Sequence, residues 1–76
     1  MMAAERVPLR HQIEEVEREL AMRQRVYPGQ VRRKTMRQGE ADLHIARMEA
    51  VLVTLRWLQE NEYRVKDAIA KTEIGE

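Results

Sequence analysis

Apolar side chains recur at intervals of three and four residues along most of this chain, and that spacing limits what it can fold into. Residues at such intervals share one face of an α-helix, which must then be buried against another element. The first series consists of Leu9, Ile13, Val16 and Leu20. Pro8 suits the first turn of a helix, and Pro28-Gly29 is typical of a helix end. The pattern therefore predicts a first helix over residues 8–26.

A longer series follows a connector of about eleven residues. It consists of Ala41, Ile45, Met48, Val51, Leu52, Leu55 and Leu58, and it thins towards the C-terminus. The spacing predicts a second helix over residues 38–70. Three glycines, two prolines and 36% charged residues favour long solvated helices over sheet. We expect an all-α fold, a single domain over residues 1–76 built as an antiparallel two-helix hairpin, with residues 1–7 and 71–76 frayed.

The second predicted helix is longer than the first and is apolar on its far side as well. Pairing back from the turn sets Leu20 near Ile45 and Leu9 near Leu55, so residues after about Trp57 overhang. The far side carries a second stripe that comprises Leu43, Ala46, Ala50, Val53 and Trp57. A helix that is apolar on two faces is buried on two faces, and a hairpin this small has little core of its own.

These features predict a homodimer that buries the second helix in a four-helix bundle. The residues expected to carry self-association are Leu43, Ala50, Val53, Trp57 and Leu58. In the alternative interpretation, Ala46 and Ala50 are merely good helix formers and Trp57 folds over the start of the first helix.

The formal net charge of +1 hides a strong asymmetry along the chain. Between Leu20 and Gly39 there are six basic residues and no acidic one, whereas the rest of the chain holds eight basic against thirteen acidic residues. Five of the six are expected to contact an acidic protein or nucleic acid: Arg25, Arg32, Arg33, Lys34 and Arg37. In the alternative interpretation, these cations complement the helix dipole and solvate a loop.

Catalysis has little support in the sequence. The two histidines, His11 and His44, lie on different predicted helices, and each has a glutamate four residues away. A metal site needs three or four ligands, and the chain has no Cys or Ser to act as a nucleophile. We expect no enzymatic activity, no cofactor, no metal and no small-molecule substrate. The longest uncharged apolar stretch, residues 50–55, is too short to span a membrane, so a cytoplasmic protein is expected.

A set of residues in the middle of the chain comprises Tyr27-Pro28, Val31, Lys34, Met36, Gln38, Glu40-Ala41, Ile45, Ala46 and Met48-Glu49-Ala50. Over about residues 17–59, this set resembles small uncharacterised helical-hairpin proteins of bacterial genomes, often in prophage regions. The resemblance implies a turn, a helix start and a prophage context, but no activity. Two positions depart from the pattern. Thr35 replaces a small residue or lysine, and Arg37 stands where Ser or Thr would form a capping box with Glu40, which removes about 1 kcal/mol of capping.

The sequence therefore predicts a non-enzymatic helical interaction or assembly protein of phage or prophage origin. The alternative is a nucleic-acid-binding accessory protein that uses the basic segment between the helices.

Overall fold

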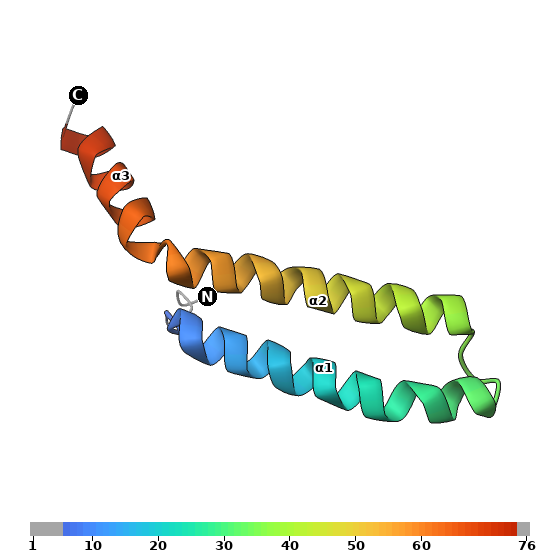
Figure 1. Cartoon of the computed structure of the whole chain (residues 1–76). Coiled ribbons are helices and arrows are strands. Elements are labelled where there is room, and N and C mark those ends of the chain that lie inside the picture. Colours follow the sequence, from blue (N-terminus) through green and yellow to red (C-terminus); the bar gives the residue numbers. More distant parts are fainter. Residues whose placement is uncertain (1–5, 75–76) are drawn as a thin grey trace, which may run out of the picture.

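The computed structural model describes residues 6–74, which form three helices and no strand (Figure 1). Helix α1 spans Leu9–Arg32, α2 spans Gln38–Glu60 and α3 spans Glu62–Ile74. α1 and α2 lie side by side and run antiparallel, and α3 bends away from the end of α2 (Figure 1). The all-α prediction is confirmed, whereas the prediction of two helices is wrong, since residues 38–70 do not form one helix. Of the predicted frayed ends, residues 71–74 belong to α3, and residues 1–5 and 75–76 lie outside the described residues.

α1 continues through Pro28 and Gly29 and ends at Arg32 instead of the predicted Val26. Proline has no N–H to donate to the carbonyl four residues earlier, so the helix lacks one hydrogen bond here. The helix continues because its last turns cover the start of α2, where Ala41 is only 2% exposed. Gln30 and Val31, both beyond the proline, are half-buried. Packing against α2 therefore outweighs the low helix propensity of Pro28-Gly29.

The end of α1 is a Schellman motif, in which two backbone N–H groups after the helix donate back to its last turn. Thr35 N–H donates to the carbonyl of Gln30 at 2.9 Å, and Lys34 N–H donates to that of Val31 at 3.0 Å. Lys34 occupies the position that usually holds glycine, with a φ of 63°. A side chain in this left-handed region costs about 1 kcal/mol, so a lysine is held in the turn at some expense of stability.

α2 begins at Gln38, as the sequence predicts. Arg37 is the N-cap residue, and its side chain accepts no hydrogen bond from the N–H groups of the first turn, because a guanidinium has no acceptor atom. Glu40 lies in that turn, where a carboxylate is favourable to the helix dipole. The capping box is therefore incomplete, as the departure at Arg37 predicts.

The core is a narrow seam between α1 and α2. Within the described residues, three apolar side chains are buried: Ile13, Ala41 and Leu52. Among the described side chains, two polar contacts cross the seam, from Arg23 to the backbone carbonyl of His44 and from Arg56 to Glu17. Half-buried residues line the seam on either side, among them Leu20, Ile45, Met48 and Leu55.

The same two contacts show which parts of α1 and α2 lie opposite each other. The Arg23 side chain reaches back along α1 to Glu19, so the stretch of α1 around residues 19–23 lies opposite His44. The prediction that Leu20 lies near Ile45 is compatible with this arrangement, since both residues are half-buried in the seam, and it stays a prediction. Because α1 and α2 are 24 and 23 residues long, α2 does not overhang α1, and only α3 extends beyond the pair.

Asn61 separates α2 from α3. Its φ of −111° and ψ of 13° are not helical, and its side-chain amide donates to the carbonyl of Trp57 at 2.8 Å. Its backbone N–H is shared between the carbonyls of Trp57 and Leu58. Asparagine competes for backbone acceptors in this way, which weakens a helix interior. The direction of α2 therefore changes at this residue.

Candidate functional site

The side of α2 that faces away from α1 presents a continuous apolar stripe, here called the outer face of α2: Leu43, Ala46, Ala50, Val53 and Trp57. The intervals alternate between three and four residues, which is the a/d repeat of a coiled-coil seam. All five residues are exposed, with Val53 at 66%, Trp57 at 55% and Leu43 at 46%. A single chain therefore leaves this face uncovered.

Two predictions about this region can be compared with the structure directly. Trp57 does not fold over the start of α1, because more than half of the residue is exposed. Leu58, the fifth residue expected to self-associate, is half-buried in the single chain and lies outside the outer face of α2. Leu43, Ala50, Val53 and Trp57 lie together on one side of one helix.

The basic turn comprises Arg25, Arg32, Arg33, Lys34 and Arg37, all exposed at the end of the molecule where α1 and α2 are joined. Among the described side chains of residues 6–70, none of these five forms an ion pair. By contrast, Arg18, Arg23, Arg56 and Lys66 each pair with a glutamate. The positive charge at this end is therefore available to an external anion.

Arg23 belongs to the interior of the pair and not to the basic turn. Its guanidinium donates to Glu19 at 2.9 Å and to the carbonyl of His44 at 3.2 Å, and its side chain is only 22% exposed. In the sequence, only its place in the i, i+3, i+4 series after Leu20 distinguishes this arginine from its basic neighbours.

Gly29 brings two of the free guanidinium groups together. A β-carbon added there would lie 3.2 Å from Nη1 of Arg33 and 3.7 Å from Nη2 of Arg32. Both side chains thus extend back over the same bare stretch of α1, and each can donate several hydrogen bonds to one anion. The pair is suited to a phosphate or carboxylate group.

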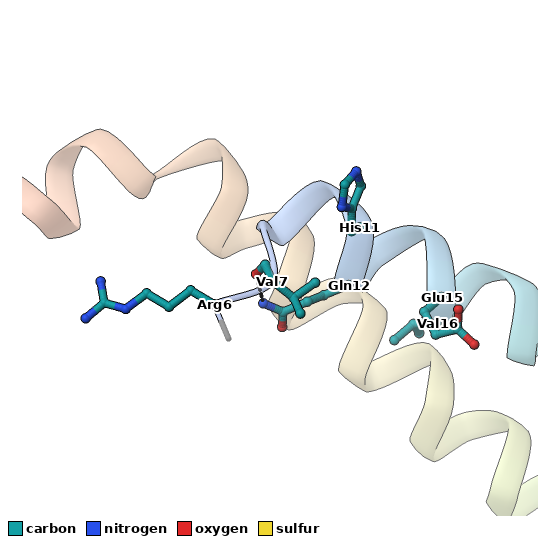
Figure 2. Close-up of a pocket in the computed structure, with 6 residues that line it drawn as sticks. All are labelled: Arg6, Val7, His11, Gln12, Glu15 and Val16. Atoms are coloured by element: carbon teal, nitrogen blue, oxygen red, sulfur yellow. Dashed lines mark hydrogen bonds between the residues drawn. The ribbon is translucent and has the colours of Figure 1, made fainter. Parts of the chain in front are cut away.

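An open depression of about 870 Å³ lies at the start of α1 (Figure 2). Its lining consists of Arg6, Val7, His11, Gln12, Glu15 and Val16. The amide of Gln12 donates to the carbonyl of Val7 at 2.7 Å, which holds the segment before α1 against the helix (Figure 2). His11 points away from Gln12 in this view, and no acid–base pair is formed with Glu15 (Figure 2). The depression therefore has no set of convergent groups suited to catalysis.

The residues that could bind a metal are also dispersed. Within the described part of the chain, no three His, Asp or Glu side chains come together as a metal site. His11 lies near the start of α1 and His44 in the first turns of α2, so the structure does not bring them together. The expectation that the chain is not an enzyme stays a prediction.

No family model, curated protein or solved structure matches this chain. The resemblance to prophage-associated helical proteins therefore stays a prediction. In the part that the structure describes, no helix combines the length and apolar character needed to cross a membrane.

Proposed function

We propose that this protein is a non-enzymatic helical interaction protein whose active form is a homodimer joined through the outer face of α2. The observation that supports the proposal most is the exposure of Leu43, Val53 and Trp57 at a/d spacing on one helix. Exposed apolar stripes of this kind mark interaction surfaces in proteins that remain in solution. In the proposed four-helix bundle the two α2 helices form the inner pair, and each α1 covers the opposite side of its own α2.

Trp57→Glu is expected to raise the Kd of self-association about 30-fold or more. A tryptophan buried in an interface is a typical hot spot, worth about 2 kcal/mol, and a glutamate there must also be desolvated. Sedimentation velocity across micromolar concentrations measures the effect, and circular dichroism checks that the helices remain.

Tyr63→Glu is the matched control, because Tyr63 is an aromatic residue that is 82% exposed on α3 and outside the outer face of α2. It should leave self-association unchanged. If the unaltered protein sediments as a 9.0 kDa species at every concentration, the proposal is wrong.

A second function is favoured by the basic turn, whose five cations have no carboxylate partner among the described side chains. We propose that this end binds the phosphate backbone of nucleic acid, with Arg32 and Arg33 directed at one phosphate. The absence of a base-stacking aromatic patch around the turn favours backbone contacts over sequence recognition.

Neutralising Arg32, Arg33 and Lys34 together is expected to reduce duplex DNA binding and its salt dependence. The slope of log affinity against log salt should decrease by about one for each phosphate contact removed. Fluorescence anisotropy with a labelled duplex measures both quantities. A variant with Arg6, Arg10 and Arg64 replaced by alanine removes the same charge at the other end and should keep the original slope. Binding to poly-glutamate but not to DNA would favour an acidic protein partner instead.

A further inference from the structure

The order of large and small side chains along the outer face of α2, and the charges beside it, favour one orientation of a second copy. This inference rests on the proposed self-association and adds the direction and register of the two helices. In the a/d repeat, Leu43, Ala50 and Trp57 occupy a positions, and Ala46 and Val53 occupy d positions. Large and small side chains therefore alternate unevenly along the face, with Trp57 at one end and two alanines at its centre.

A parallel dimer would set each of these residues against its own copy. Trp57 would meet the partner's Trp57, while Ala46 and Ala50 would each meet another alanine. A pair of tryptophans holds two helices far apart, whereas a pair of alanines needs them close together. At one constant separation, a gap would therefore remain between the alanines. A parallel dimer would also gain an attraction between Asp42 and the partner's Arg47, but this exposed pair is worth little.

The basic turns give a second reason against the parallel arrangement. Each basic turn carries five exposed cations, and none of them forms an ion pair with a carboxylate among the described side chains. A parallel dimer would place both turns at the same end of the assembly, where like charges repel. An antiparallel dimer separates the starts of the two α2 helices by about 40 Å, at 1.5 Å per residue, which is well beyond the screening length at physiological salt.

Antiparallel packing has two registers that cover the face, one heptad apart. In the first, Trp57 lies over the partner's Ala46, Ala50 lies beside the partner's Val53, and Leu43 lies opposite the partner's Glu60. In the second, Leu43 meets the partner's Val53, but Ala50 meets the partner's Ala46 and Trp57 lies opposite the partner's Gly39. The first register covers the tryptophan with an alanine and avoids facing alanines at the centre of the seam, where the second would leave a gap.

The charges that flank the face distinguish the same two registers. Glu49 and Arg56 lie seven residues apart on one flank, and both are exposed. In the first register Glu49 faces the partner's Arg56, twice in the symmetric dimer, while Arg47 faces the partner's Thr54. In the second, Asp42 faces the partner's Arg56 twice, but Glu49 faces the partner's Glu49 and Arg47 faces the partner's Arg47, so two like-charged contacts offset that attraction. Arg56 already bonds Glu17 through one nitrogen, and its side chain remains 53% exposed.

The packing of Trp57 and of the central alanines, together with the flanking charges, therefore favours the first register. We propose that a second copy of this chain docks antiparallel on the outer face of α2, with Trp57 over the partner's Ala46 and Glu49 facing the partner's Arg56. In this register Leu43 lies opposite the partner's Glu60.

The chain contains no cysteine, so introduced thiols can report the orientation without interference. Leu43→Cys and Glu60→Cys are made separately, mixed in equal amounts and oxidised with diamide at a concentration where the unaltered protein is dimeric. We expect the disulfide between position 43 of one variant and position 60 of the other to predominate, and intact mass distinguishes it from the two symmetric products. Symmetric products alone would show a parallel dimer and overturn the proposal.

A second measurement does not depend on altering the apolar face. Glu49→Arg and Arg56→Glu each place two like-charged pairs across the proposed interface, and each variant alone should raise the Kd about tenfold. An equimolar mixture should recover the original Kd, because every flanking pair is then of opposite sign. A mixture as weak as the separate variants would overturn the register. A monomeric unaltered protein would overturn both this arrangement and the proposed function, whereas symmetric disulfides in a dimer would overturn the arrangement alone.

Discussion

Leu52→Ala is expected to lower the free energy of unfolding by about 3 kcal/mol. Leu52 is 7% exposed and lies in the seam between α1 and α2. The substitution removes three buried carbon atoms and leaves a cavity that a pair of long helices can close only by moving together along their length. Because Ile13 and Ala41 are the only other buried apolar residues in the described part, few contacts remain to compensate. Chemical denaturation followed by circular dichroism measures the change.

Val51→Ala is the matched control, because Val51 precedes Leu52 on the same helix but is 45% exposed. It lies outside the outer face of α2 and should lower the free energy of unfolding by less than about 1 kcal/mol. Both variants need to be measured at several protein concentrations, since self-association adds to the apparent stability. Equal effects at positions 51 and 52 would show that the seam does not lie where the structure places it.

The sequence predicted α2 and its two apolar faces well, because their signal is periodic and long. The start at Gln38 and the exposure of Leu43, Val53 and Trp57 opposite the seam both follow from the 3.6-residue repeat. Many residues contribute to such a repeat, so the prediction of the helix and its faces does not depend on any single residue. A helix end depends on only one or two residues, and the sequence predicted the helix ends less well.

The two errors in the helices have different physical origins. At Pro28-Gly29 a strong local signal was overridden by packing, since the last turns of α1 cover Ala41 on another helix. At Asn61 a weak local signal prevailed, because α1 does not pack against α3 within the described residues. The four residues 59–62 are all polar and offer no apolar side chain to that turn of the helix. Both outcomes depend on what lies opposite, which is information that a local pattern does not contain.

The sequence predicted which residues form the candidate surfaces, but not the contacts that those residues make across the seam. Six cations around the turn are evident in the sequence, yet only the packing of α1 on α2 brings Arg23 to the carbonyl of His44. Likewise, the ion pair of Arg56 with Glu17 joins residues 39 positions apart.

Pro28→Ala is expected to raise the free energy of unfolding by about 2–3 kcal/mol, the second large effect among these predictions. Pro28 lies inside α1, four residues before its end at Arg32. Alanine there would restore an N–H donor for the carbonyl of Gln24 and remove the clash of the proline ring with that carbonyl. The unfolded chain gains freedom when proline is removed, which offsets up to about 1 kcal/mol of the stabilisation.

Pro8→Ala provides the comparison that isolates this cause. Pro8 is the N-cap residue of α1, with a φ of −56°, and the N–H of a residue at that position has no acceptor within the helix. Replacing it should leave stability unchanged or lower it slightly through the unfolded state. The denaturation midpoint should therefore rise in Pro28→Ala and stay unchanged or fall slightly in Pro8→Ala. If Pro28→Ala destabilised the protein as well, the continuation of α1 through Pro28 to Arg32 would be contradicted, and a helix end near Val26 would be favoured instead.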